Sequence, residues 1–250
     1  MAILSRVGKP VCFHAVGLEG DEEYPASGRE MEKNGPPRVL LSRRLAQKKA
    51  FSLYERHAVP GTIVDARITH LESFGVFVDI GWGFVSFIGI ENISVSRIAH
   101  PSERLRVGWD IKAVVTGVEP ASGALPDRVL LSHKELLGTW TENAALFSPG
   151  ETVTGVVRSV EDYGVFVELL PNLSGLCERD ATLHVGDRVI VYIKSIQPER
   201  MKIKLIFIDR LPAETEPGRP HYFLPDGDRL THWRYSPDIC EAKRLETVFA

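Results

Sequence analysis

Two stretches of the chain repeat each other. The first, PGTIVDARITHLESFGVFVDI, occupies 60–80, and the second, PGETVTGVVRSVEDYGVFVEL, occupies 149–169. Both contain an aromatic residue followed by Gly-Val-Phe-Val. A repeat of this kind indicates one small folding unit used twice. The 250-residue chain is therefore expected to hold small domains in series rather than one large domain.

The composition is that of an ordinary globular protein, with 44% hydrophobic and 25% charged residues. No apolar run could span a bilayer and the N-terminus lacks a signal-peptide core, so the expected compartment is the cytoplasm. The net charge of −3 argues against gripping a duplex by bulk positive charge. The three cysteines are isolated and the histidines lack metal-ligand spacing, so we expect no disulfide framework, metal or cofactor.

The spacing of apolar residues predicts short strands. Apolar and polar residues alternate over 64–68 and 76–80, and two further strands are expected around the loop 121–126. Five short strands in roughly 75 residues are typical of a small closed barrel of the OB type. The expected fold class is mainly β, with tandem five-stranded OB-type barrels over 59–147 and 148–210 and connector helices between them.

The connector after the first barrel is expected to be one amphipathic helix over 132–147. Ser132 and Glu135 have the spacing of a capping box at a helix start. Apolar residues then recur at helical spacing, at Leu136, Leu137, Trp140, Ala144 and Phe147.

The two ends of the chain differ from the repeats. Residues 1–58 resemble the last two strands of a barrel followed by a connector helix, so we expect a closing hairpin there. This hairpin is either the remainder of a longer protein or packs on the first full barrel, and we favour the remainder of a longer protein. The loop 20–37 within it is expected to be mobile. Residues 211–250 read as a linker and a tail whose aromatics, Tyr222, Phe223, Trp233 and Tyr235, suggest docking.

The repeated motif carries the candidate binding residues. Period-two alternation places Phe77 and Phe166 on the outer face of a barrel, where a large aromatic side chain can stack on a nucleobase. Phe74 and Tyr163 join them if the glycine that follows bulges the strand. The alternative is that all four rings merely cap the barrel end.

These motifs together resemble a known family. The pattern PGxxVxxxVxxxxxFGxFVxL, a VGxxIxxxVxxVxx strand and then RVLLSxK is similar to the S1 RNA-binding domain of the OB superfamily, and the tandem arrangement resembles the bacterial ribosomal protein S1 family. The resemblance implies an RNA face built from the pairs Phe74 and Phe77, and Tyr163 and Phe166, with basic positions at Arg128 and Lys202. The family's histidine is replaced by Gly89 and Glu178, which weakens that face.

Other cations complete the set of candidate RNA contacts. Arg67 and Arg158 lie in the first strand of each predicted barrel, and Arg43, Arg44, Lys48 and Lys49 cluster on a predicted helix as candidate phosphate contacts. The run Ser132-His133-Lys134 is not expected to be catalytic, because adjacent residues point in different directions.

The leading functional hypothesis is a non-enzymatic protein that binds single-stranded RNA in translation, with mRNA as partner, the small ribosomal subunit as a candidate further partner, and no membrane. The alternative is a protein-docking adaptor that uses degenerate OB barrels on the ribosome or on an RNA-processing complex. An enzymatic function is not expected, because the sequence shows no cluster of catalytic carboxylates.

Overall fold

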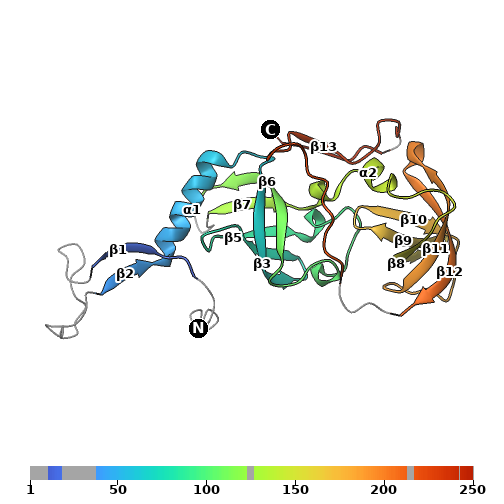
Figure 1. Ribbon diagram of the computed structural model, residues 1–250, viewed down its shortest axis with the longest axis horizontal. Helices are drawn as coiled ribbons and strands as arrows, with labels where there is room; N and C mark the ends of the chain where they lie inside the picture. The colour runs from blue at the N-terminus through green and yellow to red at the C-terminus, as the bar shows by residue number, and fades with distance from the viewer. Residues whose placement is uncertain (1–10, 19–37, 123–126, 213–216, 242, 250) are drawn as a thin grey trace.

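A computed structural model describes residues 11–18, 38–122, 127–212, 217–241 and 243–249. Its two main bodies are closed five-stranded barrels that lie side by side (Figure 1). The first contains β3 (Ile63–Glu72), β4 (Gly75–Asp79), β5 (Val85–Gly89), β6 (Asp110–Glu119) and β7 (Arg128–Ser132). The second contains β8 (Thr152–Glu161), β9 (Gly164–Leu170), β10 (Leu173–Cys177), β11 (Arg188–Gln197) and β12 (Lys202–Leu211). The predicted fold class is confirmed.

The two barrels share one connectivity and one pattern of side chains. In each, three antiparallel strands are followed by a closing hairpin whose last strand runs parallel to the third strand, as β7 does to β5 and β12 does to β10. Val76 and Val78 fill the first barrel, and Val165 and Val167 occupy the same positions in the second. Because side chains alternate along a strand, Phe77 and Phe166 between these valines point outward.

The connector between the barrels is not the single helix that the sequence predicted. It consists of a 3-10 turn, η4 (Lys134–Leu137), and a short helix, α2 (Trp140–Ala144), separated by Gly138 at φ 82°. The Ser132 hydroxyl donates to the Glu135 carboxylate and caps no helix. The capping box lies seven residues later, where the Glu142 amide donates to the Thr139 hydroxyl at 3.2 Å and the Thr139 amide to the Glu142 carboxylate at 2.7 Å.

The N-terminal part forms the expected hairpin and helix. β1 (His14–Leu18) pairs antiparallel with β2 (Val39–Ser42), and α1 (Arg43–His57) follows, its first turn capped by the Ser42 hydroxyl. Helix α1 packs on the first barrel through Ala50 and Phe51. The loop 20–37 lies outside the described residues, and the origin of the hairpin stays a prediction.

The C-terminal tail docks onto the chain's own barrels. It carries the small hairpin β13 (His232–Arg234) and β14 (Glu246–Val248) and crosses the junction of the two barrels, drawn in dark red in Figure 1. The Leu230 amide donates to Gly61 in the first barrel, and the Tyr235 hydroxyl donates to the Asn172 carbonyl in the second at 2.6 Å. Three short 3-10 turns complete the structure: η2 (Ile90–Asn92), η3 (Pro101–Glu103) and η5 (Pro198–Arg200). Within the described ranges no helix has the length and apolar character of a membrane span.

Candidate nucleic-acid interface

Three phenylalanines gather on the outer face of the first barrel. Phe77 in β4 stands directly across from Phe87 in β5, with ring centroids 5.2 Å apart. Phe74, 56% exposed in the turn before β4, lies 5.6 Å from Phe87 and meets Phe77 edge-on at 6.3 Å. Phe87 was not among the predicted contacts, although the alternation of β5 places it outward like Phe77. We call Phe74, Phe77 and Phe87 the phenylalanine face.

Gly75 allows the three rings to meet. A Cβ atom at this position would lie 2.4 Å from the Phe87 ring and 2.3 Å from the Ile88 carbonyl oxygen. The expected strand irregularity is present, but on the partner strand, where the register of β3 against β4 shifts between Ile68 and His70. Phe74 therefore joins the face through the turn, and β4 itself carries no bulge.

The phenylalanine face lies over a groove of about 390 Å³ whose lining includes a cation, Arg128. The groove is lined by Phe74, Phe77, Val85, Ser86, Phe87, Asp127, Arg128, Val129 and Leu130. Arg128 is exposed at the start of β7, opposite Glu119 in the register with β6. An apolar aromatic floor beside a guanidinium suits a nucleobase followed by a phosphate.

The second barrel presents a corresponding face with fewer aromatic rings and more lysines. Tyr163 and Phe166 meet edge-on at 6.1 Å, and Tyr163 is 69% exposed. The position of Phe87 is taken by Leu176, which pairs with Phe166. Lys204 stands across from Leu176 in β12, and Lys202 precedes it on the same exposed side. Lys204 was missed, although the alternation of Lys-Ile-Lys-Leu could have revealed it.

Arg158 is not available to RNA in this structure, which corrects its prediction as an RNA contact. Only 13% of its side chain is exposed; its Nε lies 2.9 Å from Glu168 Oε2 and its Nη1 donates to Glu103. The second barrel meets the first here and buries Glu168, and a buried carboxylate needs positive partners. Burial alone would raise the pKa of Glu168, but hydrogen bonds and positive charge from Arg104 and then Arg158 hold it below its usual value.

The remaining predicted cations have mixed surroundings. Arg67 is 63% exposed, but its Nη1 lies 3.4 Å from the Asp110 carboxylate and its residue pairs with Asp79 across β4. On α1, Arg44 and Lys48 are exposed one turn apart. Arg43 is half-buried, and Lys49 Nζ lies 3.0 Å from the His14 ring.

The Ser132-His133 pair is structural. His133 is 2% exposed, its Nδ1 lies 2.9 Å from the Ile93 carbonyl, and its Nε2 lies 3.2 Å from the Tyr222 hydroxyl of the tail. Ser132 instead contacts Glu135. Among the described residues no three His, Cys, Asp or Glu side chains gather as a metal site would require.

Two closed five-stranded barrels, each with outward aromatics on and just before its second strand and a cation on its last, define the class of OB-type nucleic-acid-binding modules. The model of the S1 RNA-binding domain matches residues 58–125 and 146–206, one match in each barrel. The chain therefore belongs to the S1 RNA-binding domain family.

The chain is similar to several ribosomal proteins. The small ribosomal subunit protein bS1 of Leuconostoc lactis is 30% identical over 67% of this chain and 42% of its own length. The bS1 homolog of Bacillus subtilis is 33% identical over 60% of this chain and 40% of its own length. The chain thus spans about two fifths of these relatives. A solved structure of an uncharacterized protein from Methanocaldococcus jannaschii is 32% identical over 27% of this chain and 97% of its own, with a TM-score of 0.23.

Proposed function

We propose that this chain binds single-stranded RNA through the outer faces of its two barrels and acts in translation, holding mRNA at the small ribosomal subunit in the cytoplasm, without catalysing a reaction. One observation carries the proposal. Both barrels hold outward aromatics at the same positions: an exposed ring just before the second strand, Phe74 or Tyr163, and a half-buried ring within it, Phe77 or Phe166. A core that needed the rings only as caps would bury them, yet Phe74 and Tyr163 are mostly exposed.

The two faces would bind RNA with different contributions from stacking and from charge. The phenylalanine face offers three rings and Arg128, so stacking dominates there, at roughly 1–3 kcal/mol for each stacked base. The second face offers Tyr163 and Phe166 beside Lys202 and Lys204, so charge contributes more. Because the whole chain carries a net charge of −3, its affinity depends on such local cations rather than on bulk charge.

The relatives support the proposed association with the small ribosomal subunit. Those reported above are named as proteins of the small ribosomal subunit. Since this chain spans about two fifths of their length, its own association with the subunit and with mRNA is part of the proposal.

A titration of a labelled, unstructured RNA strand at two salt concentrations tests the RNA binding. If Arg128, Lys202, Lys204 and Arg67 contact phosphates, the logarithm of the association constant should fall against the logarithm of salt concentration with a slope of about −3, since each phosphate contributes about −0.7 for a single strand. Strong binding that persists at the higher salt indicates stacking. An absence of binding at both salt concentrations would overturn the proposal.

A protein-docking adaptor is the second candidate, and the position of the family's histidine favours it. Gly89 stands there in the first barrel and the exposed Glu178 in the second, so that part of each face lacks an imidazole to hydrogen-bond with RNA. Purified small subunits distinguish the two functions. In either case the double variant Phe77→Ala with Phe166→Ala should lose its affinity for free RNA. It should keep its affinity for the small subunit only if the barrels dock on protein.

A further inference from the structure

Trp82 occupies the turn between β4 and β5 in a backbone conformation that side chains rarely adopt. Its φ is 56°, and the glycines on either side have φ of 117° and 73°. A bulky residue in this region is strained, and 53% of the Trp82 side chain is exposed, so burial does not offset the strain. Strained residues that persist are concentrated at functional sites.

The two barrels use this turn in different ways. In the second barrel the corresponding turn carries Asn172, which is fully buried against the first barrel and accepts a hydrogen bond from the Val95 amide at 2.9 Å. In the first barrel the turn receives α1 instead, where Gln47 Nε2 donates to the Gly83 carbonyl at 2.7 Å. This contact holds the turn but leaves the Trp82 ring uncovered.

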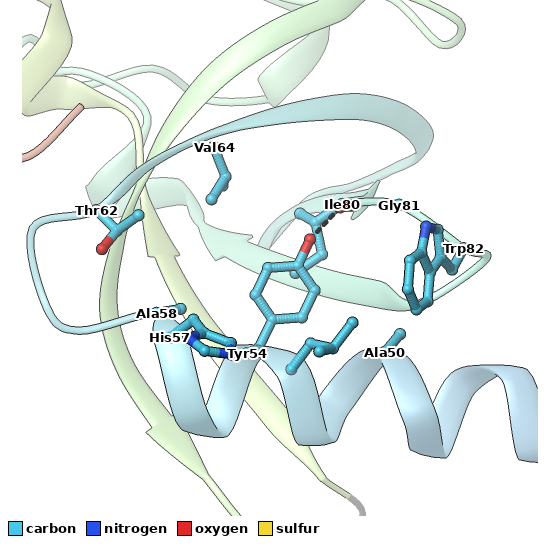
Figure 2. Close-up of a pocket in the computed structure, with 10 residues that line it drawn as sticks. Ala50, Tyr54, His57, Ala58, Thr62, Val64, Ile80, Gly81 and Trp82 are labelled. Atoms are coloured by element: carbon cyan, nitrogen blue, oxygen red, sulfur yellow. Dashed lines mark hydrogen bonds between the residues drawn. The ribbon is translucent and has the colours of Figure 1, made fainter. Parts of the chain in front are cut away.

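Trp82 forms a wall of two cavities beside α1. One, of about 390 Å³, is lined mainly by apolar groups that include Leu53, Tyr54 and Val64. Figure 2 shows Trp82 and His57 at opposite ends of this cavity with the Tyr54 ring between them, its hydroxyl bonded to the Ile80 carbonyl. The other, of about 280 Å³, contains Phe13 and Lys49. The Trp82 ring thus offers a planar aromatic surface next to open apolar space.

The helix beside Trp82 has the charge that a phosphate backbone requires. Helix α1 carries five arginine and lysine residues and a single glutamate, Glu55, in a chain whose net charge is negative. Of these, the exposed Lys49 lines a cavity together with Trp82, whereas Arg44 and Lys48 lie on the opposite face of α1. On the turn side, the acidic group is Asp79, which accepts the Gly81 amide at 2.8 Å.

The β4–β5 hairpin connects Trp82 to the phenylalanine face. Beyond the Phe77–Phe87 pair, the next outward pair in the register is Asp79 with Val85, and Val85 already lines the groove. The turn then follows. At about 3.3 Å per residue, Trp82 lies on the order of 15 Å from Phe77 along the strand, a span that a short stretch of single strand can cross.

We propose that Trp82 and α1 extend the RNA interface of the first barrel, so that a strand leaving the phenylalanine face stacks one more base on Trp82 and sets the next phosphate against Lys49. This inference rests on the proposed RNA binding. The occupant is a nucleobase because an exposed indole ring, open apolar space and flanking cations are the elements of a single-strand stacking site.

The test uses two unstructured RNA strands, a short one of about 4 nucleotides that covers one barrel face and a longer one of about 12. Trp82→Gly removes the ring and relieves the backbone strain, so the melting temperature should stay constant or rise while the affinity for the longer strand falls on the order of tenfold. The short strand should bind as before. Lys49→Glu should act in the same direction, and Lys243→Glu, which makes the same change of charge at an exposed position of the tail, serves as the charge control.

The outcomes separate this inference from the proposed function. If the unaltered chain binds neither strand, the proposed function fails. If Phe77→Ala weakens both strands but Trp82→Gly weakens neither, RNA binding stands and the extension is wrong. Equal losses for both strands in Trp82→Gly would also overturn the extension, because Trp82 would then belong to the primary site.

Discussion

The terminal guanidinium nitrogens of Arg104 in the first barrel donate hydrogen bonds to both carboxylate oxygens of Glu168 in the second, and both side chains are buried. Arg158 bonds the same carboxylate from within the second barrel. Each barrel closes on itself, so this contact is part of what fixes their relative orientation. The Asn172 turn and the C-terminal tail add to the same junction.

We expect Arg104→Ala to destabilise the protein strongly. The substitution leaves the buried Glu168 carboxylate with Arg158 as its remaining arginine partner. Removing one partner of a buried ion pair costs about 3–5 kcal/mol in unfolding free energy, and the remaining Arg158 should reduce this loss. Urea unfolding measures the loss. Arg67→Ala removes an exposed pair and is the control, for which a change below about 1 kcal/mol is expected. Equal effects of the two substitutions would contradict the role of the junction.

Stability should depend on pH through His133. Burial lowers the pKa of His133 from 6.5 to about 4, and the charge of Arg104 acts in the same direction, while the bond to the Ile93 carbonyl opposes them. The unfolded chain thus binds a proton that the folded chain excludes, so the stability is complete above pH 6.5 and is lost as the pH falls toward 4. Between about pH 7 and about pH 5 the loss should be about 2 kcal/mol.

The variant His133→Gln checks this assignment. Glutamine does not titrate and can still donate to the Ile93 carbonyl, so the pH dependence of the unfolding free energy in this window should become shallower even if the variant is less stable overall. Glu168 acts at lower pH, because its pKa is held below its usual value of 4.5. An unchanged pH dependence in His133→Gln would assign the effect to another group.

Features that depend on residues close in sequence were predictable, and features that depend on distant contacts were not. Alternation and the internal repeat predicted the barrels and the outward Phe77 and Phe166, because both depend on residues close in sequence. The helix over 132–147 was wrong because Gly138 adopts a positive φ that separates two short turns. The role of Arg158 was wrong because it pairs with Glu168 of its own barrel and with Glu103 of the first, and the packing of the two barrels at least partly buries all three side chains.

Phe77→Ala and Phe166→Ala should each weaken RNA binding while leaving the fold intact. Each ring is partly exposed and packs on other surface aromatics rather than in the core, so the change in melting temperature should be small. The affinity should fall on the order of tenfold, as expected for one lost stacked base. Tyr192→Ala, which removes an exposed aromatic from β11, is the matched control. A large drop in melting temperature with unchanged affinity would make the rings structural.

Lys204→Glu should weaken RNA binding and make it less sensitive to salt. Lys204 stands beside Leu176 at the center of the second face, so its loss should reduce the slope of the salt dependence by about 0.7. The matched control is Lys243→Glu in the tail, which changes the net charge equally. If both variants lose the same affinity, overall charge explains the effect and Lys204 makes no specific contact.

Single strands should compete for the protein far better than duplexes of the same sequence. The phenylalanine face holds three rings around a groove of about 390 Å³, and a ring can stack only on a base whose face is exposed. A duplex hides its base faces, so only Arg128, Lys202 and the other exposed cations could hold it, and a chain with a net charge of −3 offers few of them. Competition of an unlabelled pyrimidine-rich strand and of its annealed duplex against a labelled single strand measures the difference. Phe77→Ala should reduce the preference for single strands over duplexes, because it removes stacking and leaves the cations in place. Equal competition by the two forms would show that phosphates alone are recognised and that the aromatic faces take no part in binding.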